Sequence, residues 1–238
     1  MHRILPAAAF ALVVPAAASA VVIDNFDDGA FVLTAAGSSD DRPSDRTTVT
    51  GDPSNILGGQ REVTLNLNRG RGVVDARTLA NIESTGDGGV LALSDSGRAF
   101  SELVLSYRNL GGVDLTEGGT QDAFLLDYDF FQGFSRVAAL VRSGAGTGTG
   151  VVFVAESDND RIVGPASRAN AQQRLIAFAD FNGTVDFGDV DSVEFFINSQ
   201  DSALGGATDF ELDSITTVPE PAGLALLAAG AALLRRRR

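Results

Sequence analysis

Short runs of alternating apolar and polar residues dominate this 238-residue chain. In the run REVTLNLN (61–68), Val63, Leu65 and Leu67 fall on one face of a strand, and polar residues fall on the other. Similar runs, separated by Gly, Asp, Asn and Ser, occupy residues 21–26, 46–50, 72–77, 88–94, 101–108, 122–130, 135–143, 150–157, 173–181, 191–199 and 208–216. About ten to twelve short strands without a convincing amphipathic helix predict an all-β fold, a single β-sandwich of jelly-roll type.

Two segments interrupt this strand pattern without dividing it. The segment SRANAQQRL (167–175) could contain a turn or two of helix. The segment SGAGTGTG (143–150) is interpreted as a mobile hairpin loop, because strand-like runs flank it closely on both sides. No internal repeat suggests two domains, and the 197 residues from 21 to 217 are enough for one core. We therefore expect residues 21–217 to form one domain.

Several residue types are absent from this domain, and their absence excludes much chemistry. Cysteine, lysine and tryptophan do not occur, and the single histidine is His2. Residues 21–217 can therefore form no disulfide, no Ser-His-Asp triad, no lysine Schiff base and no histidine-ligated metal site. They carry 13 arginines and 30 carboxylates, a net charge near −17, which should repel nucleic acid and attract cations or basic partners.

The first twenty residues, MHRILPAAAFALVVPAAASA, have a basic start, an apolar stretch and small residues at Ala18 and Ala20. This is the layout of a secretory signal peptide, and we expect cleavage after Ala20. Pro6 and Pro15 argue against a buried helix here. Export through the Sec machinery is the first functional expectation.

The last residues, VPEPAGLALLAAGAALLRRRR (218–238), combine a Pro-Glu-Pro triplet, an apolar run and four arginines. The run Ala222 to Leu234 has 13 residues, fewer than the ~20 that comfortably span a bilayer. The arginines favour the cytoplasmic side, so this single membrane helix would hold the domain outside as a transient anchor.

This arrangement resembles the PEP-CTERM sorting signal of Gram-negative bacteria, with Pro219, Glu220 and Pro221 at the motif positions. The resemblance implies recognition and cleavage by an exosortase, followed by sorting to the cell surface, the outer membrane or the extracellular polymer matrix. An ordinary C-terminal helix docked on the domain is the alternative. In SNILGGQRE (54–62), Ile56, Gly58, Gly59 and Arg61 resemble a stretch of exported PEP-CTERM β-proteins.

The stretch 54–62 also has a physical interpretation. Paired glycines permit backbone angles closed to other residues, and the arginine could anchor the start of the strand to a carboxylate. A simple turn before a strand explains the same residues, so we treat the stretch as a family marker and not as an active site.

Acidic segments lie near both ends of the predicted domain, at DNFDDG (24–29) and DFELDSI (209–215). They resemble segments of jelly-roll carbohydrate-binding modules of the galactose-binding-like type, where such segments meet around a structural calcium ion. By that resemblance Asp27, Asp28 and Asp213 would supply calcium ligands, with backbone carbonyls completing the coordination. Solvated turn carboxylates are the alternative.

Three functional hypotheses remain. The first is a non-catalytic matrix or surface protein associated with exopolysaccharide, and the second is a calcium-stabilised carbohydrate-binding module. Sugar-binding sites often use exposed tryptophan or tyrosine rings as platforms. Here the only tyrosines are Tyr107 and Tyr128, and the phenylalanines mostly occupy core positions, which argues against such a platform. The third is a glycan-active hydrolase, for which Asp127 and Asp129 would be the first carboxylates to test. We expect no enzymatic activity.

Overall fold

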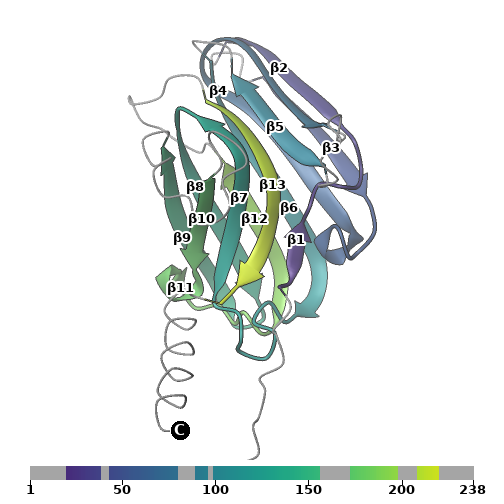
Figure 1. Cartoon of the computed structure of the whole chain (residues 1–238), viewed down its shortest axis with the longest axis vertical. Helices are drawn as coiled ribbons and strands as arrows, with labels where there is room; N and C mark the ends of the chain where they lie inside the picture. The colour runs from purple at the N-terminus through teal and green to yellow at the C-terminus, as the bar shows by residue number, and fades with distance from the viewer. Residues whose placement is uncertain are drawn as a thin grey trace, which may run out of the picture.

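The computed structural model describes residues 20–38, 43–79, 89–95, 99–155, 172–197 and 208–219, and this part of the chain is built of strands (Figure 1). They are β1 (Val22–Asp24), β2 (Val32–Ser38), β3 (Ser44–Thr50), β4 (Gln60–Leu79), β5 (Val90–Asp95), β6 (Ala99–Val113), β7 (Ala123–Gln132), β8 (Phe134–Ser143), β9 (Gly146–Ala155), β10 (Gln172–Ala177), β11 (Asn182–Gly183), β12 (Val190–Ile197) and β13 (Asp209–Val218). Two single-turn 3-10 helices, η1 (Leu57–Gly59) and η3 (Phe178–Asp180), complete the described elements. The predicted all-β class is confirmed.

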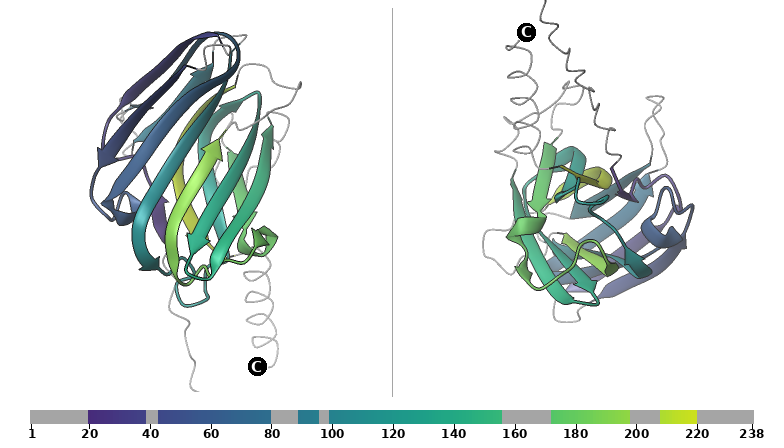
Figure 2. Two further views of the ribbon diagram at one scale, coloured as in Figure 1. Left: turned by 180° about the vertical axis from the view of Figure 1, so that it is seen from behind. Right: turned by 90° about the horizontal axis from the view of Figure 1, so that it is seen from below.

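The strands form two antiparallel layers that face each other, as Figure 2 shows from behind and from below. The long strand β4 belongs to both layers. Its first half pairs with β3 and β6 in sheet B, and its second half pairs with β2 and β5 in sheet A. Sheet A continues through β13 to β7 and β10, and sheet B continues through β12, β8 and β9 to β11. The sandwich is therefore one folded sheet with β4 at the bend.

Aromatic side chains fill part of the space between the layers. Phe124 of β7 in sheet A meets Phe195 of β12 in sheet B edge to face, with ring centroids 5.3 Å apart. Phe210 of β13 is also buried, as its alternating position predicts. Tyr107 and Tyr128 are fully buried as well, so neither can serve as an exposed platform for a sugar ring.

The predicted strands differ from the observed ones in a few places. Residues 61–68 and 72–77, predicted as separate strands, belong to the single strand β4. The strands β2 and β11 have no predicted counterpart. The suggested helical turn at 167–175 is wrong for its described part, because β10 begins at Gln172. Residues 156–171 lie outside the described part of the chain.

The predicted loop at 143–150 is largely strand. Only a tight turn at Gly144 and Ala145 separates β8 from β9, which begins at Gly146. The glycines of β9 face a layer formed by residues 178–187. A Cβ atom at Gly150 would lie 2.4 Å from a ring carbon of Phe181, and one at Gly148 would lie 2.9 Å from Val185. These glycines make room for the covering segment. The glycine-rich composition, which suggested a flexible loop, is therefore explained by close packing.

The two ends of the described domain lie side by side, because β1 pairs with β13 through Val22 and Thr216. The predicted signal peptide lies outside the described residues up to residue 19, including Ala18, and so do Glu220, Pro221 and the apolar run after them. No helix within the described residues is long and apolar enough to cross a membrane.

Candidate functional site

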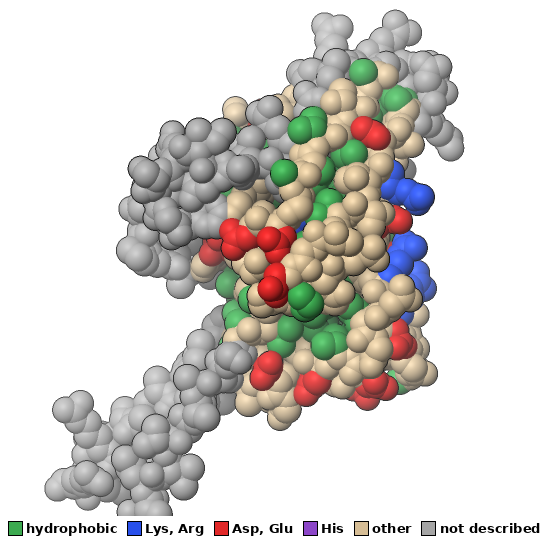
Figure 3. Space-filling view, turned by 90° about the vertical axis from the view of Figure 1, so that its right-hand side faces the viewer, with side chains coloured by type: hydrophobic (Ala, Val, Ile, Leu, Met, Phe, Trp, Pro, Cys, Tyr) green, Lys and Arg blue, Asp and Glu red, His purple; other side chains and the backbone are tan. Residues whose placement is uncertain are grey.

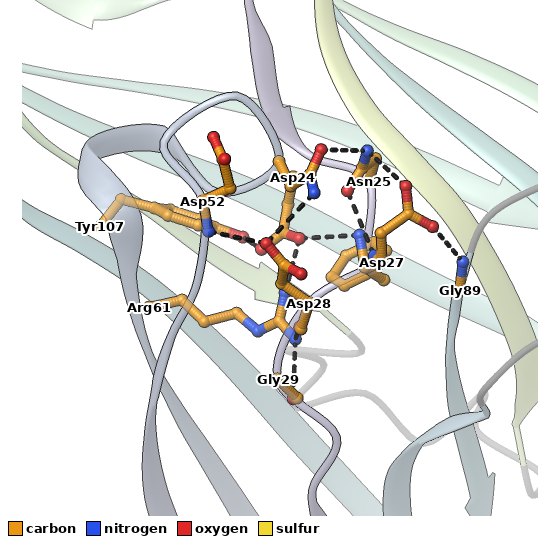
Figure 4. A network of polar contacts seen from close by, with 11 residues as sticks. Asp24, Asn25, Asp27, Asp28, Gly29, Asp52, Arg61, Gly89 and Tyr107 are labelled. Atoms are coloured by element: carbon orange, nitrogen blue, oxygen red, sulfur yellow. Dashed lines mark hydrogen bonds and ion pairs between the residues drawn. The ribbon is translucent and has the colours of Figure 1, made fainter.

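The acidic segment after β1 forms a hydrogen-bonded clasp with the loop before η1, shown in Figure 4. Asp24 is fully buried and pairs with the equally buried guanidinium of Arg61 from the start of β4. The same carboxylate accepts hydrogen bonds from the Tyr107 hydroxyl at 2.8 Å and from the Phe26 N–H at 2.9 Å. The predicted anchoring of Arg61 to a carboxylate is thus observed, with Asp24 as its partner.

Arg61 also organises the backbone of the acidic loop. Its second terminal nitrogen donates to the carbonyl oxygens of Asp28 at 2.8 Å and Gly29 at 3.3 Å. Burial raises the pKa of Asp24, while the charge and hydrogen bond of Arg61 oppose that rise. Burial and the neighbouring Asp24 raise the pKa of Tyr107 well above its ordinary value, so the phenol remains a hydrogen-bond donor. The centre of the clasp, formed by Asp24, Arg61 and Tyr107, is fully buried and joins β1 to β4 and β6.

The carboxylates predicted to bind calcium accept hydrogen bonds from nitrogen donors. Asp27 accepts from the N–H of Gly89 at 2.7 Å, and Asp28 accepts from the N–H of Asp52 at 2.6 Å and the Asn55 amide at 3.1 Å. Within the described ranges, no three Asp, Glu, His or Cys side chains gather into a group that could hold a metal ion. Asp213 lies half-buried on β13. The observed role of Asp27 and Asp28 is to join loops, and calcium binding stays a prediction.

The carboxylates considered for hydrolysis alternate with Tyr128 along β7, so they point away from the core. Asp127 accepts a hydrogen bond from the Gln173 side chain at 3.0 Å, and both Asp127 and Asp129 are half-buried. Neither residue contributes to the hollow described next.

The described surface has a hollow of about 670 Å³ at one end of sheet B. Three neighbouring strands supply its lining: the end of β6, the end of β8 and the start of β12. The lining residues are Arg108, Asn109, Gly111, Arg142, Asp191, Ser192 and Glu194. This set contains six polar or charged side chains and no aromatic one, so the hollow suits a ligand that forms many hydrogen bonds.

The strand register places two arginines on either side of the central strand. Ser192 of β12 is paired with Arg108 of β6 and with Arg142 of β8. In the ladder with β8, Val190 and Ser192 face the adjacent residues Ser143 and Arg142, so Asp191 is an extra residue and occupies a bulge. In the ladder with β6, the extra residues lie in β6, between Arg108 and Val113. A bulge turns a side chain away from its regular direction, which explains how Asp191 and Ser192, adjacent in the chain, both line one hollow.

Two carboxylates position Arg108. Its guanidinium lies 3.0 Å from Glu194 and 3.8 Å from Glu62, although its side chain is 56% exposed. Such exposed ion pairs add little stability, but they limit the directions in which the guanidinium can point. Arg142 is exposed on the other side of Ser192. The four charges of the lining cancel, because Arg108 and Arg142 are matched by Asp191 and Glu194.

Sequence reasoning did not identify this hollow. Five of its seven residues come from runs predicted as strands, whereas Asn109 and Gly111 follow the predicted run 101–108. Only the pairing order β6-β12-β8 brings these residues together. The sequence gives one signal in hindsight. Arg108 and Arg142 each lie near the end of an alternating run, next to the inward-facing residues Tyr107 and Val141, so their side chains project outward.

On the face shown in Figure 3, acidic and basic side chains occupy different parts of the described surface. The acidic side chains gather near the middle and at the lower end, and the basic side chains lie together along one edge. The balanced charge of the hollow therefore differs from the net negative charge of the domain.

No protein-family model and no curated protein match the chain. Among solved structures it is similar to the family 11 carbohydrate-binding module of a cellulosomal cellulase of Clostridium thermocellum, with 13% identity, a TM-score of 0.42, and coverage of 86% of this chain and 96% of that one. A structure of the Clostridium thermocellum family 11 module with a β-1,3-1,4-mixed-linked tetrasaccharide has 13% identity, a TM-score of 0.43 and coverage of 86% and 98%.

A family 28 module specific for non-crystalline cellulose has 9% identity, a TM-score of 0.39 and coverage of 60% of this chain and 79% of that one. These identities and TM-scores are too low to transfer a ligand or an activity to this chain.

Proposed function

We propose that this chain is an exported, non-catalytic protein whose sandwich binds a neutral, hydroxyl-rich polysaccharide in the hollow of sheet B. The observation that carries the proposal is the pair of arginines on either side of Ser192, with Asp191 and Glu194 in the same lining. Guanidinium groups donate hydrogen bonds, carboxylates accept them, and the amide of Asn109 does both. A sugar with several hydroxyl groups, each a donor and an acceptor, complements this set.

The charge and composition of the lining favour a neutral ligand. An acidic polysaccharide would meet Asp191 and Glu194 in the hollow and a strongly negative domain around it. A large apolar ligand would leave the polar lining without hydrogen bonds, which is costly. Because none of the described lining residues is aromatic, we expect modest affinity that depends on hydrogen bonds.

The binding test uses the full chain and a panel of neutral and acidic polysaccharides, measured by affinity electrophoresis and calorimetry with and without calcium. We expect Arg142→Ala to weaken binding to a neutral polysaccharide by roughly tenfold, the effect of losing about one charged hydrogen bond. The matched control is Arg46→Ala, an exposed arginine of β3 in the same sheet but outside the hollow.

Equal binding by Arg142→Ala and the unchanged chain would place the ligand elsewhere. No binding to any neutral polysaccharide would overturn the proposal and leave a structural matrix role without glycan recognition. Release of reducing sugar by the full chain would overturn the non-catalytic part.

Two features of the described domain support the proposed export and exosortase processing. Ala20 is exposed just before β1, so a signal peptidase could reach the bond after it. The strand β13 ends at Val218, and Pro219 follows it directly, so the proposed sorting motif begins where the folded domain ends. In cells, the C-terminal segment should be lost only when the exosortase is present. An unchanged protein mass in both strains would contradict the sorting proposal.

A further inference from the structure

We propose that Asn182 is an acceptor for an N-linked oligosaccharide. The tripeptide Asn182-Gly183-Thr184 has the Asn-x-Ser/Thr form of an N-glycosylation acceptor. No other asparagine of this chain is followed two positions later by serine or threonine. Asp180 lies two residues before Asn182, and we include this acidic side chain in the proposed acceptor. This modification is separate from the proposed polysaccharide binding, and the two share only the requirement that the chain is exported.

The structure displays this tripeptide on the surface. Asn182, Gly183 and Thr184 are all exposed, and Asp180 is exposed as well. Asn182 and Gly183 form β11, the last strand of sheet B, and β9 is its only pairing partner among the described residues. Within the described part of the chain, the asparagine therefore lies at the outer edge of sheet B, where an enzyme can approach.

Residues on both sides of the tripeptide hold it in place. Phe181 and Val185 are half-buried and pack against the core, and the ring of Phe181 lies 5.0 Å from that of Phe187. Between these anchors the backbone turns at Gly183, which has a φ of 108°. A Cβ atom at Gly183 would lie 2.2 Å from the carbonyl oxygen of Thr147, so only glycine fits. The packing of β11 on β9 therefore requires glycine at position 183, the middle residue of the acceptor tripeptide.

The chemistry requires a polyprenyl-pyrophosphate-linked oligosaccharide as the donor. The side-chain nitrogen of Asn182 would form a bond to the anomeric carbon of the first sugar. The bond from that carbon to the pyrophosphate oxygen breaks, the lipid pyrophosphate leaves, and the asparagine nitrogen loses one proton to the enzyme or to water. No oxidant or reductant is needed.

An oligosaccharide at this position would also protect the sheet. The edge strand of a β-sheet has unpaired backbone groups that favour association with other chains. A bulky, hydrated group on β11 would block such pairing at the edge of sheet B. The hollow lies on β6, β12 and β8, with β9 between it and β11, so the modification need not cover it.

The test incubates the folded full chain with a purified bacterial single-subunit oligosaccharyltransferase and its lipid-linked oligosaccharide. We expect the intact mass to rise by one oligosaccharide, and peptide mass spectrometry to place it on Asn182. Asn182→Gln and Thr184→Val should lose the modification, and Thr184→Ser should keep it. Asp180→Asn, which preserves the tripeptide, should reduce transfer at least several-fold. Thermal unfolding of each variant checks that the domain still folds.

The proposal is overturned if the folded chain stays unmodified, whether or not the urea-unfolded chain is modified. It is also overturned if Asn182→Gln gains the same mass as the unchanged chain. Because this assay uses purified components, its result does not depend on export or on polysaccharide binding.

Discussion

The buried ion pair of Asp24 and Arg61 is the residue-scale feature with the largest expected effect on stability. Replacing one partner leaves a buried charge without compensation, so Arg61→Met should lower the free energy of unfolding by about 3–5 kcal/mol. The double variant Asp24→Asn with Arg61→Met should cost less than the two single changes together. Urea denaturation measures all three, and Arg46→Met, an exposed control, should change little. A small effect for Arg61→Met would contradict this role of the pair.

Asp95 should make stability depend on pH. Burial is the main cause that raises its pKa from 3.8 to about 6, with Asp209 adding to the rise and the hydrogen bond from Ser101 opposing it. The folded state therefore binds this proton more tightly than the unfolded state does. The resulting stability is fully present below pH 4 and is lost as the pH rises to about 6, by roughly 3 kcal/mol.

Urea denaturation between pH 4 and pH 7 measures this effect as the difference between the unchanged chain and Asp95→Asn. Asp209→Asn should move the window to lower pH, because it removes a neighbouring negative charge. Parallel stability curves for Asp95→Asn and the unchanged chain would refute the assignment.

At the scale of elements, the glycines of β9 are required by the segment that covers them. Gly150→Val would place methyl groups where the ring of Phe181 and the side chain of Ile176 lie. Overpacking of this kind costs about 1–3 kcal/mol. Thr149→Val is the control, because Thr149 alternates with Gly150 and points the other way. If both variants unfold at the same urea concentration, Phe181 and Ile176 do not pack against Gly150.

At the scale of the whole molecule, the sandwich closes through its first and last strands. β13 lies between β7 and β5, and its last residues also pair with β1. A chain ending at Pro219 should unfold cooperatively at the same temperature as the full chain. A chain ending at Leu212 should show no cooperative unfolding. The truncation removes the residues of β13 that pair with β1 and most of those that pair with β7. Calorimetry distinguishes the two, and cooperative unfolding of the shorter chain would contradict the importance of this closure.

The alternating pattern by itself determined most of the strands, since a half-buried strand must alternate whatever its neighbours are. The strand β2 escaped prediction because Val32, Thr34 and Ala36 all point to an exposed face, so little contrast marks the run. The glycines of β9 suggested a loop, because the residues that pack on them lie some thirty positions later in the chain.

The sequence also determined what the chemistry of the domain cannot include and suggested a carboxylate partner for Arg61. It could not identify that partner, because Asp24 is one of many carboxylates and only folding buries it. Only the tertiary structure decided which residues line the hollow, because strand order and a bulge at Asp191 bring them together. Alternation is a local property of the backbone, and it persists in any sandwich. The neighbours of a strand depend on pairing across the whole chain, which no local pattern encodes.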